Sequence, residues 1–505
     1  MATSSEIYLE LVELSGHVVA KGTWSATLQA HCLYQCAHLA KPGRRCRLLQ
    51  GASEITPVTS LAALDLRLGT CIQIVWLSSS AADRHSKIEA FAAIKADGSA
   101  VTWGCAWGGG DSSAVATHLT EGVVQICGID AAFAAIKADG NVVTWGDADF
   151  GGDSSAVAPL LSEGVVQVCG NDRAFAAIKA DGSVVTWGCA WGGGDSSVVA
   201  TLLTEGVVQI RASDMAFAAI KADGSVVTWG EIDGGGDSSA VAPLLIEGVV
   251  QVCGIAEAFA AIKADGSVVT WGEADCGGDS SALAPLLTEG VVQVCGNDRA
   301  FAAIKADGSV LTWGNAGFGG DSSAVAPLLT EGVVQVCKNV RAFAAIRADG
   351  SVVTWGDALC GGDSSAVAPL LMEGIVQVCR SYFAFAAIKA DGSAVTWGAI
   401  GCGGDSTAVA PLLMEGVVQI CGIASAFAAI KADGSVVTWG DGDGGGDSSA
   451  VAPLLSEGVV QVYGSFEAFA AIKADGSVVT WGSARGGGDS SAVAALLAEG
   501  VFQVC

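Results

Sequence analysis

Carboxylates and cysteines are the residues of this sequence best suited to chemistry, and both recur at fixed spacing. Asp in Ala-Asp-Gly, Asp in Gly-Gly-Asp and Glu in Glu-Gly return every 42 residues from 86 to 505. Calcium loops gather their oxygen ligands within about twelve residues, whereas the three carboxylates of one copy are separated from one another by ten to fourteen residues. We therefore interpret them as solvated turn residues, and we expect neither a metal nor a cofactor.

Cysteine is the next candidate, as a nucleophile or a zinc ligand. The chain has 17 cysteines, and in eight of the ten copies one follows a Val-Val-Gln-Val strand, from Cys127 to Cys505. Arg211 and Tyr463 hold that place in the other two copies, and the sequence contains no Cys-x-x-Cys pair of the kind that binds zinc. A position that accepts Arg or Tyr is not a metal ligand. We expect small, half-buried apolar side chains in a reducing compartment.

Other catalytic patterns are incomplete. Gly-Gly-Gly-Asp-Ser-Ser lacks the Lys that reaches the phosphates in a phosphate-binding loop. A Ser/His/Asp triad needs a histidine, and His118 is the only one in the repeats. The sequence therefore predicts a protein that is not an enzyme.

The repeats themselves predict the architecture. Ten copies of a 42-residue unit fill residues 86–505, with a Phe from Phe91 to Phe469 and a Trp twelve residues after each, from Trp103 to Trp481. A fixed period of this length is typical of propellers, solenoids and arrays, whose units bury their apolar faces against their neighbours. Such architectures usually serve binding.

Each unit predicts three strands and a short helix. Asp97-Gly98 is a typical two-residue hairpin loop, which would pair Ile94 with Val101, Ala92 with Trp103, and Phe91 with Gly104. Ala-Val-Ala-Pro-Leu-Leu, after an Asp-Ser-Ser start, predicts a helix of about two turns. Val-Val-Gln-Val predicts the third strand. The array begins with a hairpin that lacks this third strand and finishes with an unpaired one at 501–505, so the two ends could complete one blade of a ring.

These units resemble the regulator of chromosome condensation repeat family. The matching residues are Gly164-Val-Val-Gln-Val, Ala174-Phe-Ala-Ala-Ile and Ala180-Asp-Gly-Ser-Val-Val-Thr-Trp-Gly188. The resemblance implies a mainly β, propeller-like fold. Family members have longer repeats and seven blades, whereas ten exceed the usual ~4–8, so one ring, two rings and an open β-solenoid or spiral are all left open. Some members promote nucleotide exchange on a small GTPase.

Residues 1–79 form a separate predicted domain, followed by the repeat domain at 80–505. Strands near Tyr8–Leu14, His17–Lys21, Cys46–Gly51 and Gly69–Val75, with a helix over Ser25–Leu39, resemble an α+β ubiquitin-like (β-grasp) domain. The resemblance places Leu49 and Ile74 where ubiquitin carries its recognition patch. The alternative is that both residues are ordinary core.

Variation among the copies is concentrated in two windows, one before Ala-Phe and one after Trp-Gly. In the predicted hairpin both windows lie away from Asp-Gly and would form one face of the array; relaxed drift in two loops is the alternative. They contain residue types that often anchor interfaces, and the candidate partner-binding residues are Trp107, Arg173, Trp191, Arg299, Arg341, Tyr382 and Phe383. We expect a non-catalytic scaffold for protein–protein interaction, linked to ubiquitin signalling, with a guanine-nucleotide exchange factor as the alternative. The expected partners are proteins, among them ubiquitin-system components or a small GTPase.

Charge and hydropathy exclude two other classes of partner. The net charge is −27, and the invariant residues contribute −2 per copy. Because nucleic-acid binding depends on Lys and Arg that neutralise phosphates, we expect no DNA or RNA partner. The apolar runs are too short for a membrane helix. Residues 1–8 have no signal-peptide pattern, so we expect a cytoplasmic or nuclear protein.

Overall fold

The computed structural model describes residues 6–13, 18–25, 33, 46–50, 53–55, 61, 64, 70–76 and 87–505. The chain divides into two compact units, Met1–Arg84 and His85–Cys505. No helix in the described ranges is long and apolar enough to span a membrane.

The first unit contains a mixed five-stranded sheet with strand order β2-β1-β5-β3-β4. β1 and β5 are parallel, and the other pairs are antiparallel. The predicted strands are confirmed, whereas the predicted helix lies outside the described residues except for Ser25, which ends β2, and Leu33, which is buried and helical. The relation to ubiquitin stays a prediction. The strands are β1 (Glu6–Glu13), β2 (Val18–Ser25), β3 (Cys46–Gln50), β4 (Ser53–Ile55) and β5 (Cys71–Trp76).

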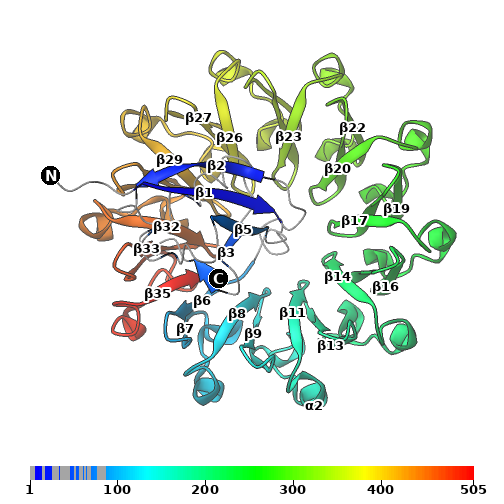
Figure 1. The fold of residues 1–505 in the computed structure, drawn as a ribbon. Helices are drawn as coiled ribbons and strands as arrows, with labels where there is room; N and C mark the ends of the chain where they lie inside the picture. Colours follow the sequence, from blue (N-terminus) through cyan, green and yellow to red (C-terminus); the bar gives the residue numbers. More distant parts are fainter. Residues whose placement is uncertain are drawn as a thin grey trace. The chain divides into compact units, whose positions relative to one another are not determined.

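The second unit consists of ten three-stranded antiparallel sheets, which we call blades 1 to 10. Each blade has an inner, a middle and an outer strand, and the inner strands lie nearest the centre in Figure 1. The inner strands of blades 1 to 10 are β35 (Val501–Val504), β8 (Val123–Gly128), β11 (Val165–Gly170), β14 (Val207–Ala212), β17 (Val249–Gly254), β20 (Val291–Gly296), β23 (Val333–Lys338), β26 (Ile375–Arg380), β29 (Val417–Gly422) and β32 (Val459–Gly464). The middle strands are β6 (Ala90–Lys95), β9 (Ala132–Lys137), β12 (Ala174–Lys179), β15 (Ala216–Lys221), β18 (Ala258–Lys263), β21 (Ala300–Lys305), β24 (Ala342–Arg347), β27 (Ala384–Lys389), β30 (Ala426–Lys431) and β33 (Ala468–Lys473). The outer strands are β7 (Ala100–Gly104), β10 (Val142–Gly146), β13 (Val184–Gly188), β16 (Val226–Gly230), β19 (Val268–Gly272), β22 (Val310–Gly314), β25 (Val352–Gly356), β28 (Ala394–Gly398), β31 (Val436–Gly440) and β34 (Val478–Gly482).

The hairpin register predicted from Asp97-Gly98 is wrong by one residue. Phe91 pairs with Trp103, and Ile94 pairs with Ala100. The loop has three residues because the Gly98 N–H donates to the Lys95 carbonyl (2.8 Å) while Gly98 adopts a positive φ of 77°, the type I turn plus bulge that three-residue hairpins favour. Asp97 stabilises this loop by accepting hydrogen bonds from the Ser99 N–H (2.9 Å) and hydroxyl (2.6 Å).

The corrected register gives every blade one large and one small face. Phe175 and Trp187 lie side by side on the large face, with ring centroids 5.2 Å apart. They pack against Ala132 and Ala134, on the small face of the preceding blade. The Trp187 indole N–H donates to the Gly151 carbonyl of that blade (3.0 Å). Burial of aromatic rings against alanine backbones, repeated at each interface, therefore holds the blades together.

The array closes into a single ring, so the open-solenoid alternative is wrong. β35, at the C-terminal end of the repeats, pairs with β6 at their beginning and completes blade 1. Across this junction the Trp103 indole donates to the Gly487 carbonyl (3.0 Å), as at every other interface, and the Arg485 guanidinium contacts the Glu89 carboxylate (2.7 Å). Figure 1 shows the ring along its axis.

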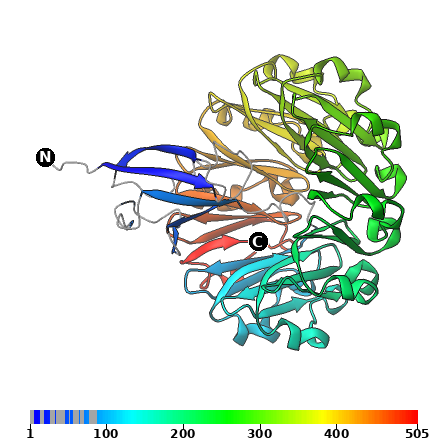
Figure 2. The same cartoon turned by 45° about the vertical axis from the view of Figure 1, so that its right-hand side comes forward.

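The predicted short helices are mostly single 3₁₀ segments at the rim of the ring (Figure 2). A Pro inside most of them limits hydrogen bonding, and a buried Leu anchors each segment, as Leu203 does in blade 3. One copy has a four-residue α-helix, α2 (Ala158–Leu161). The 3₁₀ segments are η4 (Ser113–His118), η6 (Ser155–Val157), η8 (Ser197–Leu202), η10 (Ser239–Leu244), η12 (Ser281–Leu286), η14 (Ser323–Leu328), η16 (Ser365–Leu370), η18 (Thr407–Leu412), η20 (Ser449–Leu454) and η21 (Ser491–Val493).

Candidate protein-binding face

Two loops of each blade carry the sequence variation, and the structure brings them together. Loop A is the three residues before the middle strand, and loop B is the four residues after the outer strand. In blade 7 they are 339–341 and 357–360, and the Asp357 N–H donates to the Arg341 carbonyl (3.0 Å). Equivalent bonds recur around the ring, for example from Cys189 to Arg173. The loops therefore form one surface, the variable face, while the Asp-Gly turns form the opposite, constant face.

Loop B is part of a tight turn and overlaps a short helical segment in nine of the blades. These segments are η3 (Ala106–Gly110), η5 (Ala148–Phe150), η7 (Ala190–Gly194), η9 (Ile232–Gly236), η11 (Ala274–Cys276), η13 (Ala316–Phe318), η15 (Ala358–Cys360), η17 (Ile400–Cys402) and η19 (Gly442–Gly446). Because they follow rigid outer strands, their side chains are held at defined places on the variable face.

The side chain of the first loop A residue connects loops A and B through hydrogen bonds. Asn339 is fully buried, and its side-chain amide donates to the Cys360 carbonyl (2.6 Å). Its side-chain oxygen accepts from the Arg341 and Ala342 N–H groups (3.0 and 2.8 Å). Asn or Ser occupies this position in six blades and donates to the equivalent loop B carbonyl, whereas Ile occupies it in others. This position is structural.

The second residue of loop A lies at the centre of the variable face. Val340 donates its N–H to the Tyr382 carbonyl in the next blade (3.2 Å), and Tyr382 donates to Ala424 (3.2 Å). The chain of bonds continues through Phe466 to Ile88 of blade 1. The Tyr382 and Phe466 rings meet edge to face at 5.5 Å. Loop A residues that are far apart in the sequence are thus linked by hydrogen bonds at the centre of the variable face.

The third residue of loop A and the loop B side chains are the most exposed part of this face. Trp107 and Trp191 are 67% and 71% exposed, and Arg173, Arg299 and Arg341 are also exposed. Tyr382 and Phe383 are half-buried and in edge contact at 6.2 Å. All seven residues predicted from the repeats lie on the variable face, but they are spread over five blades instead of forming one cluster.

Several residues of this face were not predicted. Phe318 lies between two guanidinium groups, 5.9 Å from Arg299 and 5.1 Å from Arg341. Lys338 and Arg380 end inner strands at a position that is Gly in most other blades. That replacement of Gly by a cation was a visible signal in the sequence, whereas the role of Phe318 required the three-dimensional arrangement.

Charges at the centre of the face influence one another across blades. Burial and the nearby Asp214 carboxylate raise the pKa of Asp298 to about 6, although the cations Lys338, Arg380 and Lys87 oppose this shift. Burial also raises the pKa of Tyr382, and the Asp130 carboxylate adds to the effect. Lys87 forms an ion pair with Asp172 (3.9 Å). The centre is therefore a mixed-charge cluster in a partly desolvated setting.

The inner-strand cysteines are half-buried or buried, and several of their thiols contact the next blade. The Cys337 thiol donates to the Val378 carbonyl (3.5 Å), and the Cys505 thiol donates to the Ile126 carbonyl (3.6 Å). Burial raises the pKa of Cys379 to about 12, so its thiol is protonated at neutral pH. Within the part of the chain that the structure describes, no group of three or more His, Cys, Asp or Glu side chains is placed to hold a metal ion.

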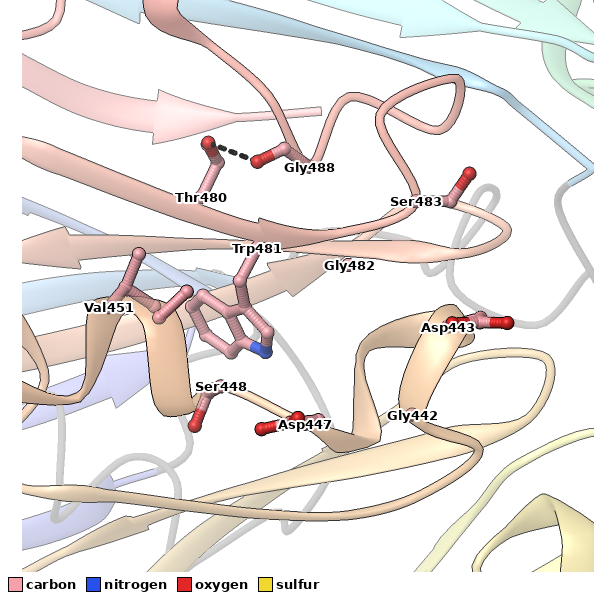
Figure 3. Close-up of a pocket in the computed structure, with 11 residues that line it drawn as sticks. Gly442, Asp443, Asp447, Ser448, Val451, Thr480, Trp481, Gly482, Ser483 and Gly488 are labelled. Carbon is pink, nitrogen blue, oxygen red and sulfur yellow. Dashed lines mark hydrogen bonds between the residues drawn. The ribbon is translucent and has the colours of Figure 1, made fainter.

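One groove opens between blades 9 and 10 (Figure 3). It is lined by Asp443, Asp447, Ser448, Trp481 and Ser483, among others. Its polar groups belong largely to the framework: Asp447 accepts from the Ser449 N–H (2.8 Å), which lowers the pKa of Asp447, and the Thr480 hydroxyl donates to the Gly488 carbonyl (3.0 Å). The groove is therefore part of the packing interface between blades 9 and 10.

The predicted recognition residues of the first unit have different outcomes. Ile74 is 1% exposed and packs in the core with Leu9, Leu11 and Leu48. Its proposed place on an exposed patch is wrong, because it lies on the covered side of β5. Leu49 belongs to β3, and its side chain lies outside the described residues.

No protein-family model matches this chain, and no curated protein resembles it in sequence. Solved structures give alignments at low identity. Prp20p from Saccharomyces cerevisiae, studied for its binding to Gsp1p and histones, is 17% identical over 47% of this chain and 72% of its own, with a TM-score of 0.29. Human WBSCR16 is 17% identical over 47% and 80%, with a TM-score of 0.29. The computationally designed Ika8 protein is 14% identical over 63% and 96%, with a TM-score of 0.28. Yeast RCC1 (Prp20) is thus among the similar structures, but similarity at this level establishes no shared function.

Proposed function

We propose that this protein is a non-catalytic scaffold that binds protein partners through the variable face of its ring. One observation carries the proposal: the framework repeats from blade to blade, while the differing side chains collect on one face. A partner that distinguishes this protein from other repeat proteins must contact those side chains. Exposed Trp107 and Trp191, and the cluster around Tyr382, Phe383 and Phe466, are the residue types that dominate binding energy at interfaces.

The closed ring supports this proposal energetically. Its blades are held by buried Phe and Trp side chains and by backbone hydrogen bonds, so the loops sit on a rigid base. Rigid presentation lowers the conformational entropy that binding must overcome. Loop substitutions on such a base alter recognition without altering the fold.

The test compares matched exposed residues on the two faces. The immobilised full chain is compared with a Trp107→Ser/Trp191→Ser variant and with a Val250→Thr/Val292→Thr variant, whose valines are each 58% exposed beside the constant face. Proteins retained from a lysate are quantified for all three. We expect the tryptophan variant to lose specific partners and the valine variant to keep them. The opposite pattern would place binding on the constant face.

Two narrower versions of the function have their own tests. Nucleotide exchange on a small GTPase is the alternative suggested by the repeat signature, and no acceleration of nucleotide release across a GTPase panel would eliminate it. A link to ubiquitin signalling rests on the predicted ubiquitin-like unit. Binding of ubiquitin receptors by the full chain, lost when residues 1–80 are removed, would support that link; no difference between the two chains would contradict it.

A further inference from the structure

The variable face is divided electrostatically, although the molecule as a whole is strongly acidic. In blades 2 to 5, loops A and B contain ten carboxylates and one cation, Arg173. In blades 6 to 8, the same loops together with the preceding inner-strand residue contain four cations, Arg299, Lys338, Arg341 and Arg380, and two carboxylates, Asp298 and Asp357. We call the latter region the basic sector.

The basic sector is continuous in space. Phe318 of blade 6 contacts both Arg299 of its own blade and Arg341 of blade 7. Blades 7 and 8 are joined at the centre by the hydrogen bond from Val340 to Tyr382 (3.2 Å). The Phe318 ring makes cation–π contacts with both guanidinium groups, and these contacts offset the repulsion between the two cations.

Positive charge in this sector is only partly neutralised within the protein. Arg341 forms an ion pair with Asp357 at 3.5 Å, with both groups partly open to solvent. The Lys338 ammonium donates to the Gly296 carbonyl, which satisfies a hydrogen bond without cancelling charge. Arg299 is exposed and has no ion pair among the described residues. Exposed apolar side chains flank these cations: Leu359 is 81% exposed and Ile400 is 75% exposed.

Resting on the proposed function, we propose that the basic sector binds an acidic segment of a partner protein that also carries an apolar or aromatic side chain. Guanidinium groups bind carboxylates in a bidentate manner, and Leu359, Ile400 and Phe383 supply apolar surface beside them. The acidic loops of the neighbouring blades confine the occupant to three blades. They would repel a long polyanion such as a nucleic acid, which extends beyond the sector.

The test uses a fluorescein-labelled Glu-rich peptide with one central Trp and measures fluorescence anisotropy with the full chain. Arg299→Glu with Arg341→Glu should weaken binding at least about tenfold, since each change turns attraction into repulsion. Arg173→Glu is the matched control, because Arg173 occupies the same loop A position and stacks on Phe150 at 5.4 Å but lies among carboxylates. It should change binding less than about twofold. Circular dichroism melting checks that all variants remain folded.

Three results would overturn the proposal. They are equal weakening by Arg173→Glu, tighter binding of the same peptide with Lys in place of Glu, and equal binding of an RNA oligonucleotide of matched charge. Failure of this proposal can be distinguished from failure of the proposed function. If the Trp107→Ser/Trp191→Ser variant loses lysate partners while the Arg299→Glu/Arg341→Glu variant keeps both them and the Glu-rich peptide, the variable face binds partners but the basic sector does not.

Discussion

The two faces of the ring are built from the same blades but differ in what their residues do. On the constant face each Ala-Asp-Gly-Ser turn repeats the same bonds, in which Asp307 accepts from the Ser309 N–H (2.9 Å) and hydroxyl (2.7 Å). On the variable face the backbone bonds between loops A and B are kept, while the exposed side chains change from Arg to Glu to Trp. Main-chain geometry can therefore be repeated ten times while side-chain chemistry diverges.

Tryptophan offers the sharpest comparison between framework and loop. Trp271 is 4% exposed, stacks on Phe259 at 5.3 Å and donates to the Gly235 carbonyl (3.0 Å). Trp271→Ala should lower the free energy of unfolding by about 3–5 kcal/mol. Trp191→Ala, on the variable face, should lower it by less than about 1 kcal/mol. Guanidinium denaturation measures both, and equal losses would mean that the loop tryptophan is part of the core.

Ring closure gives the next largest effect. Val504, in the strand that completes blade 1, is fully buried, whereas Phe502 in the same strand is 49% exposed. Val504→Ala should cost about 2 kcal/mol, and Phe502→Ala should cost under about 1 kcal/mol. If both changes leave the unfolding midpoint unchanged, the closing strand does not hold the ring shut in solution.

Asn339 tests the connection between loops A and B. Asn339→Ala removes the side chain that satisfies the Cys360 carbonyl and two N–H groups, and should cost about 1–2 kcal/mol. Asn339→Ser should recover part of this loss, because Ser381 donates to the equivalent carbonyl in blade 8 (2.8 Å). Urea denaturation of the three proteins checks the order, and a Ser variant less stable than the Ala variant would contradict it.

The smallest effect concerns pH, and it should have opposite signs on the two faces. Burial raises the pKa of Asp298 from 3.8 to about 6, so its stabilising contribution is present below about pH 4 and is lost as pH rises to 6. Relative to the wild type, Asp298→Asn should therefore become more stable over that range. Hydrogen bonds from Ser309 lower the pKa of Asp307, so its contribution is lost as pH falls through the acidic range, and Asp307→Asn should become relatively less stable as pH rises. Thermal unfolding from pH 2 to 7 measures both, because the Asp307 contribution changes only below about pH 4; trends of the same sign would contradict the assignment.

The parts of the fold that could be predicted are those that follow directly from the repeat. The period, the three strands and the unpaired strand at 501–505 predicted a propeller-like array, and placing both windows opposite Asp-Gly predicted the variable face. The register failed because Asp-Gly suits both two-residue and three-residue loops, and the Ser99 hydrogen bonds that select the longer one depend on side-chain geometry. The sequence could not assign Ile74 to the core or to a recognition patch, because an apolar residue in a strand is compatible with both positions.

The most direct test of the central claim is to exchange loops between blades. Blade 7 is given the loop A and loop B residues of blade 5, whose framework is nearly the same. Asn339 is kept because its side chain satisfies buried groups of the framework, so the required substitutions are Val340→Ala, Arg341→Glu, Asp357→Glu and Leu359→Asp. Denaturation measures the fold, and quantified capture from a lysate measures partner binding, beside the Val250→Thr/Val292→Thr variant. We expect the exchanged chain to have an unfolding free energy within about 1 kcal/mol of the wild type and to lose specific partners. Partners retained by the exchanged chain but lost by the valine variant would contradict it.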